Sequence, residues 1–214
     1  MKATSSTPKR ITAALAQFFS TMLSPLLMPS YGAFLVLWGS FLSSRDTGDR
    51  ATILIVFFGI TCMLPMFFIS ALQHLRVVRS KRLEDSKERL YPYLFTLLCY
   101  IAACFYLDHV HAPLWFIMFA TGTCLACAVS LVVNLRWKIS AHMAGMGGIV
   151  ALIYIMHVQM LEAFNLLWVM VVAIMLTGIL GSARMALKHH DVYQVIAGTL
   201  NGYLSVWLMM TLWG

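Results

Sequence analysis

The chain has 214 residues, of which 61% are hydrophobic and only 11% are charged. Soluble globular domains have about 25% charged residues, so this composition excludes that class and indicates a protein that crosses a membrane several times. The 15 Lys and Arg residues outnumber the 8 Asp and Glu residues, which gives a net charge of +7.

Apolar segments that cross about 30 Å of hydrocarbon as helices need about 17 to 25 residues. After a polar N-terminal tail at 1–10, seven such segments follow in chain order: 22–42, 52–72, 91–107, 113–135, 140–161, 165–182 and 191–213. Pro25 and Pro29 interrupt the start of the first segment, which leaves open a count of six with an interfacial first segment. The sequence therefore predicts an all-α, polytopic transmembrane helix bundle of six or seven helices, which forms a single domain over 11–214.

The loops between these segments form two groups. Parity places three basic loops, 74–92, 136–142 and 182–194, on one face of the membrane, and near-neutral or acidic loops on the other. Lys and Arg accumulate on the cytoplasmic side of membrane proteins, which explains part of the net charge. It does not explain His142 and His190, each of which opens a predicted membrane helix, where ionisable residues are functional candidates.

Cationic side chains together with histidines indicate a phosphate site, because phosphate is bound by Arg and helix N-termini and its transfer needs a proton donor. His190 and Gln194 are four residues apart, so both project from one side of the predicted helix. The Gln194 carbonyl can accept a proton from one ring nitrogen, which leaves the other free as a nucleophile. His142 can protonate the leaving oxygen as a general acid. Nearby Gly145, Gly147 and Gly148 indicate close helix packing.

The order of these residues resembles the three-motif signature of the type 2 phosphatidic acid phosphatase superfamily. That superfamily also includes glucose-6-phosphatase, dolichyl diphosphate phosphatases, bacterial acid phosphatases and vanadium haloperoxidases. Its motifs are K-x6-R-P, P-S-G-H and S-R-x5-H-x3-D, and the resemblance covers roughly residues 80–205 of this chain.

In the first motif, Arg89 matches the arginine and Arg82 stands at the lysine position, with six residues between them. Lys81 is the adjacent candidate if the loop is shifted. The proline departs from the pattern, because it is displaced to Pro92.

In the second motif, "ISAH" keeps Ser140 and His142 but loses the proline and the glycine. In the third, Arg184 and His190 are kept, whereas an alanine replaces the serine and Gln194 replaces the aspartate. Gln at that position also occurs in the glucose-6-phosphatase and dolichyl diphosphate branches, so the departure does not indicate an inactive protein.

The resemblance implies an integral membrane phosphatase that forms a phosphohistidine on His190, without a catalytic metal or other cofactor. Its expected substrate is a lipid phosphomonoester or diphosphate, such as phosphatidic acid, phosphatidylglycerol phosphate, a polyprenyl (di)phosphate or a lipid A type phosphate. The expected partners are this substrate and the bilayer, with no nucleic acid, and the oligomeric state stays open. The expected phosphate ligands are Arg89, Arg184, Ser140, Lys138 and Arg82 or Lys81.

Two alternatives remain open. One is a lipid phosphotransferase, in which a lipid hydroxyl instead of water attacks the phosphohistidine. The other is a non-enzymatic cofactor-binding or transport protein that uses His142 and His190 as haem ligands, although haem ligation gives no reason for Arg89 and Arg184 at matching offsets.

The expected location is a bacterial inner (cytoplasmic) membrane. The excess of Lys and Arg places the motif face in the cytoplasm, whereas the family resemblance implies the periplasmic or lumenal side. The side of the membrane that the site faces is therefore left open.

Overall fold

The computed structural model describes residues 7–75 and 86–212, and the side chains of 13–75 and 90–212. These residues are all-α, with one isolated backbone bridge between Ser40 and Glu162, which confirms the predicted class. In chain order the elements are α1 (Thr7–Met22), α2 (Met28–Gly39), the 3-10 turn η1 (Phe41–Ser44), α3 (Thr47–Phe58), the π-helical turn η2 (Gly59–Met63), α4 (Leu64–His74), α5 (Ser86–His109), α6 (Leu114–Asn134), α7 (Ala141–Val158), α8 (Leu167–Ala186) and α9 (Val192–Thr211).

Five helical segments in the described ranges are long and apolar enough to cross a membrane, which is compatible with a multi-pass membrane protein. They are Thr47–His74, Leu90–His109, Leu114–Asn134, Ala141–Val158 and Leu167–Ala186. The expected count of six or seven is not reproduced in the described residues. The first predicted segment is divided into helices too short to span, and the last is not apolar enough over its length. α9 has 20 residues but carries polar side chains such as Gln194 and Asn201.

The first predicted segment, 22–42, is divided into two helices. α1 ends at Met22 and α2 has only 12 residues, because Pro25 has no N–H to donate and disfavours helical backbone in the residue before it. Pro29 is tolerated in the first turn of α2, where its missing N–H needs no partner. α1 begins at Thr7, so helix starts inside the stretch 1–10 that was expected to be a polar tail.

The second predicted segment, 52–72, is longer than expected. α3, η2 and α4 join into one 28-residue span despite Pro65. The N–H of Leu64 bonds to the carbonyl of Gly59, five residues earlier, so the helix widens by one residue just before the proline. A π-helical turn of this kind accommodates a residue that cannot donate the regular bond.

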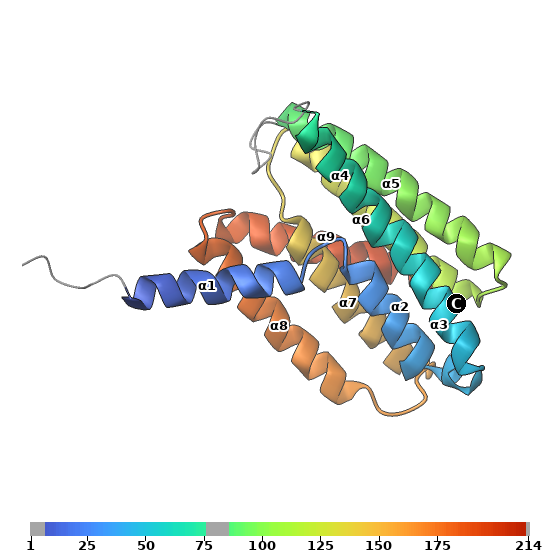
Figure 1. The fold of residues 1–214 in the computed structure, drawn as a ribbon. Coiled ribbons are helices and arrows are strands. Elements are labelled where there is room, and N and C mark those ends of the chain that lie inside the picture. The colour runs from blue at the N-terminus through green and yellow to red at the C-terminus, as the bar shows by residue number, and fades with distance from the viewer. Residues whose placement is uncertain (1–6, 76–85, 213–214) are drawn as a thin grey trace, which may run out of the picture.

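α7 is the central helix of the bundle (Figure 1). Of the 18 residues of α7, 61% are buried, against 22 to 39% in an apolar stretch of the same length in each of the other four spans. α7 packs against α2, α6, α8 and α9, while α4, α5 and α6 run together along one side. α1 crosses the end of the bundle beside α8, and its N-terminal end points away from the other helices (Figure 1).

Glycines bring α7 and α9 into backbone contact. A Cβ on Gly147 would collide with the carbonyl of Thr199, and a Cβ on Gly202 would collide with the carbonyl of Ala144. Gly145 gives the same close approach to the Met28 side chain of α2. The close packing predicted for Gly145, Gly147 and Gly148 is confirmed, and it fixes the first half of α7 against the middle of α9.

Candidate functional site

The segment that resembles the third motif folds as a helix end, a reversal and a helix start. Arg184 lies in the last turn of α8, and the N–H groups of Lys188 and His189 bond to the carbonyls of Met185 and Arg184, at 2.9 and 3.1 Å. This is a Schellman arrangement, in which Lys188 takes a left-handed conformation with φ of 54°. The reversal brings His190 back toward Arg184, which gives the five-residue gap between them a structural reason.

His190 lies one residue before the N-cap of α9, instead of opening the helix as expected. Asp191 is the N-cap, and its carboxylate accepts from the Gln194 N–H at 2.9 Å. The Gln194 Oε1 lies 2.9 Å from the His190 Nδ1, which is the contact expected from the four-residue spacing. Because Oε1 accepts, Nδ1 carries the proton of the neutral ring, and Nε2 keeps the lone pair.

The surroundings of His190 favour its neutral form. Burial lowers the pKa of His190 to about 4, although the hydrogen bond to Gln194 acts in the opposite direction. The positive charges of Arg184 and Lys138 lower the pKa further. A neutral His190 with a free Nε2 has the protonation state that a nucleophile needs.

The segment that resembles the second motif is tied to the third. Ser140 is the N-cap residue of α7, and its N–H donates to the backbone carbonyl of Gln194 at 3.3 Å. The N–H of Ile139 donates to the Oδ1 of Asn134, also at 3.3 Å, which turns the chain from α6 into α7. Gln194 therefore orients His190 with its side chain and holds the start of α7, next to His142, with its backbone.

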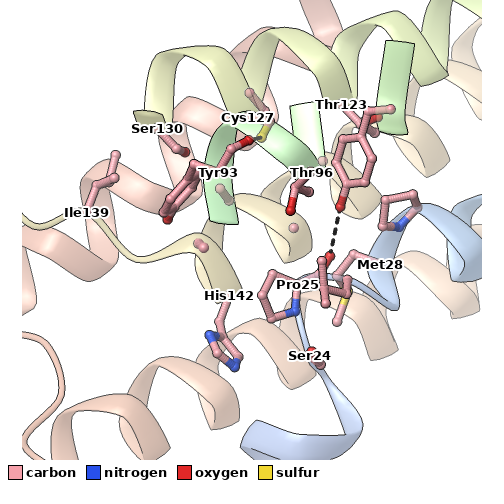
Figure 2. A pocket seen from close by; sticks show the side chains of 18 of the residues that line it. Ser24, Pro25, Met28, Tyr93, Thr96, Thr123, Cys127, Ser130, Ile139 and His142 are labelled. Atoms are coloured by element: carbon pink, nitrogen blue, oxygen red, sulfur yellow. Dashed lines mark hydrogen bonds between the residues drawn. The ribbon is translucent and has the colours of Figure 1, made fainter. Parts of the chain in front are cut away.

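A cavity of about 370 Å³ opens beside these residues, and its basic lining residues are Lys138, His142, Arg184 and His190. In Figure 2, His142 lies on the same side as Ser24 and Pro25, and Tyr93 lies across the cavity from it. Most of the remaining wall is apolar and includes Leu26, Met28, Pro29, Phe119, Ala126, Ala144, Gly145, Ile149 and Val206. The cavity thus has one basic end, and the rest of its wall is mostly apolar, with hydroxyl and amide side chains such as Thr96, Thr123 and Asn134 among the apolar ones.

Two buried donors near the basic end have no hydrogen-bond partner in the described part of the chain. They are the Nε of Arg184 and the Oγ of Ser140. Arg184 lines the cavity, so a guanidinium with unused donor capacity lies beside it. Ser140 is fully buried and does not line the cavity, so the structure does not place its hydroxyl where the expected phosphate contact needs it.

The residues that resemble the first motif are only partly described. The backbone of Arg89 lies in the first turn of α5, but its side chain is outside the described residues, as are Lys81 and Arg82 entirely. Pro92 and Tyr93, one turn further along α5, line the cavity. The N-terminal part of α5 therefore reaches the same cavity as the other two motif segments.

One residue at the site was not identified from the sequence. Ser20, in the last turn of α1, lies within hydrogen-bonding distance of both His142 and Arg184. Its signal in the sequence is weak, because it is a single serine on an apolar helix, spaced four residues from the buried Ala16. Nothing in local spacing connects it to residues more than 120 positions away.

In the described ranges, no group of three or more His, Cys, Asp or Glu side chains is arranged to hold a metal ion. The charged side chains that line the cavity are Lys138 and Arg184, with His142 and His190 beside them. Comparison of the chain with protein-family models, with curated proteins and with solved structures finds no match in any of the three.

Proposed function

We propose that the protein is an integral membrane phosphatase that hydrolyses the phosphomonoester or diphosphate of a lipid. The observation that carries the proposal is the two-part cavity, in which Lys138, His142, Arg184 and His190 form one end and apolar side chains form most of the rest. A lipid phosphate has the same two-part chemistry, with an anionic head and an apolar chain. Arg, Lys and a helix N-terminus suit the head, and the apolar wall suits the chain.

The proposed reaction has two steps. The Nε2 lone pair of His190 attacks phosphorus, the bond to the leaving oxygen breaks, and that oxygen takes a proton from protonated His142. Water then attacks the phosphohistidine and gives its proton to His142, and the P–N bond breaks to release inorganic phosphate and neutral His190. Arg184 and Lys138 stabilise the charge on the phosphoryl oxygens in both steps.

The arrangement of the helices supports the proposal. The segments that resemble the second and third motifs of the type 2 phosphatidic acid phosphatases lie side by side, joined by the hydrogen bond from Ser140 to Gln194. The depressed pKa of His190 keeps the proposed nucleophile neutral at physiological pH. Haem ligation by the two histidines does not account for the spacing of Arg184 and His190, which resembles the third motif.

The test is release of inorganic phosphate by the purified protein in detergent micelles. The substrates are phosphatidic acid, phosphatidylglycerol phosphate, a polyprenyl diphosphate and a lipid A phosphate, each also given to the His190→Ala variant. We expect release from at least one substrate by the wild type and none by the variant. Absence of release from all four contradicts a phosphatase, and transfer of the phosphoryl group to a lipid hydroxyl without release identifies a phosphotransferase instead.

A further inference from the structure

The end of α1 contacts two residues of the proposed site, although α1 lies outside the region that resembles the phosphatase motifs. Ser20 is only 5% exposed. The Nη1 of Arg184 donates to the Ser20 Oγ at 2.7 Å. The Nε2 of His142 lies 3.1 Å from the Ser20 carbonyl oxygen and 3.4 Å from its Oγ. One residue therefore touches both the proposed acid and the proposed phosphate ligand.

The contact with the carbonyl of Ser20 determines which nitrogen of His142 carries the proton. A backbone carbonyl only accepts hydrogen bonds, so Nε2 is the protonated nitrogen in the neutral ring. Nδ1 is then the nitrogen that gains and loses a proton during a reaction. His190 is held in the opposite sense, with its Nδ1–H on Gln194 and its Nε2 free.

Ser20 reaches these side chains from outside the space that a ligand would fill. His142 and Arg184 line the cavity, whereas Ser20 does not. Ser20 therefore does not obstruct the cavity. Ser20 contacts both side chains from outside the cavity. In catalytic triads, a residue orients the histidine in the same way, by bonding the ring nitrogen that points away from the substrate.

The last turns of α1 are held in place by packing. Ala16 and Ser20 are four residues apart and both are buried on the side of α1 that faces the protein, where α1 packs on α8. Leu15 and Phe18 are 54% and 57% exposed on another side of the helix. Exposed apolar side chains suit a membrane interface, so burial on one side and lipid on the other fix the position of Ser20.

We propose that Ser20 is a positioning residue of this site, which orients Arg184 through its hydroxyl and His142 through its carbonyl. The proposal rests on the proposed function for the reaction that these residues perform. α1 is then a part of the active site instead of an appended anchor. The hydroxyl can be removed by substitution, and the carbonyl contact can be observed directly, so each half has its own test.

The first test compares Ser20→Ala with Thr21→Ala, using orthovanadate as a phosphate analogue. The Thr21 hydroxyl donates to the Gln17 carbonyl within α1 and the side chain is exposed, which makes Thr21→Ala a matched control. Loss of the Ser20 hydroxyl leaves Arg184 less well oriented, so we expect the dissociation constant for vanadate to rise about fivefold, the factor of one net hydrogen bond. The Thr21→Ala value should equal that of the wild type, and Ser20→Thr, which keeps a hydroxyl, should recover most of the affinity.

Two results of this test would overturn the proposal. An unchanged dissociation constant for Ser20→Ala would mean that the hydroxyl does not orient Arg184. Tighter vanadate binding would mean that the hydroxyl competes with the ligand for the guanidinium.

A double substitution tests the same contact. In an Arg184→Lys background, the Ser20→Ala substitution should have less than a twofold effect on the dissociation constant, because the guanidinium that the hydroxyl contacts is already gone. A further fivefold loss would count against the proposal.

The second test needs no activity. Nitrogen NMR on protein with isotope-labelled histidine, at about pH 8 where both rings are neutral, should show an Nε2–H tautomer for His142 and an Nδ1–H tautomer for His190. His142→Gln and His190→Gln variants assign the two signals. An Nδ1–H tautomer for His142 would contradict the role of the Ser20 carbonyl.

The outcomes separate this inference from the proposed function. A wild-type protein that neither binds vanadate nor releases phosphate contradicts the proposed function and the role of Ser20 in it. A wild-type protein that binds vanadate, and that Ser20→Ala matches in affinity, contradicts the role of Ser20 alone.

Discussion

The two ends of the bundle differ in what lies beside their polar groups. Among the described residues, buried side-chain atoms without a partner occur at both ends, but Gln159, whose Oε1 is one of them near Glu162, does not line the cavity, whereas Arg184 does. Between α7 and α8, Glu162 has both carboxylate oxygens satisfied, by His157 Nδ1 and by the N–H of Leu166, each at 3.0 Å. At the other end, the Nε of Arg184 is buried without a partner beside a cavity. Satisfied polar groups stabilise the chain locally, whereas buried donors with unused capacity next to a cavity indicate a place for a ligand. Substitutions at the two ends should therefore have different effects.

The largest effect is expected at His190. His190→Ala should lower turnover on the order of 10³-fold or more, because no other group can form the covalent intermediate. The melting temperature should stay close to that of the wild type. His109, exposed at the C-terminal end of α5, provides the control, and His109→Ala should keep full activity. Activity of His190→Ala within tenfold of the wild type would reject the assignment of the nucleophile.

His142→Ala should have the next largest effect, and its size should depend on the substrate. A general acid contributes roughly 10²- to 10⁴-fold, and most when the leaving oxygen is basic. The loss of kcat should therefore be large with a lipid phosphate and much smaller with p-nitrophenyl phosphate, whose leaving group needs little protonation. Equal losses with the two substrates would show that His142 is not the acid.

Substitutions of Gln194 should change the pH profile more than the affinity. The reactive form of His190 is neutral, so kcat/KM should fall as the pH drops through its pKa of about 4. Gln194→Asp places a carboxylate beside Nδ1, which favours the imidazolium, so the acidic limb should move to higher pH by roughly one unit. Gln194→Ala removes a contact that raises the pKa, so its acidic limb should move to lower pH, with a lower kcat.

These pH shifts are measured as kcat/KM profiles in detergent micelles with one lipid phosphate. An unchanged kcat and an unchanged acidic limb in Gln194→Ala would mean that the glutamine only packs, and would make the neighbouring His189 a candidate for the nucleophile.

The smallest effect is expected at Glu162, at the opposite end. Burial raises the pKa of Glu162, but the hydrogen bonds from Leu166 and His157 outweigh it and hold the pKa below its usual range. The charged carboxylate therefore stabilises the fold above its unfolded pKa, and this contribution is lost as the pH falls through the folded pKa. Glu162→Gln should lower the melting temperature by about 2 to 4 °C at neutral pH and leave kcat/KM unchanged.

The difference between Glu162→Gln and the wild type should disappear under acidic conditions, where the wild-type carboxylate is also neutral. A loss of activity without a change in melting temperature would show that the two ends do not differ in the way proposed.

Several features of the site could be predicted because they depend on neighbours in the chain. The contact between His190 and Gln194 follows from a four-residue spacing, and it forms even though His190 precedes the helix. Close packing follows from the glycines of α7, since only a missing side chain lets two backbones meet. The sequence indicated that Pro25 and Pro29 interrupt 22–42, but it did not predict two separate helices. Hydropathy measures apolar length and does not register that a helix ends before Pro25.

The contacts of Ser20 depend on the tertiary structure alone. The separation of 122 residues between Ser20 and His142 carries no periodic signal, and the contact exists only because α1 packs across α8 at the end of the bundle. The cavity is likewise lined by residues from α2, α5, α6 and α7, among other helices, so no single helix specifies it. Spacing along the chain determines which side chains project from the same face of a helix. The packing of separate helices determines which of those side chains come into contact.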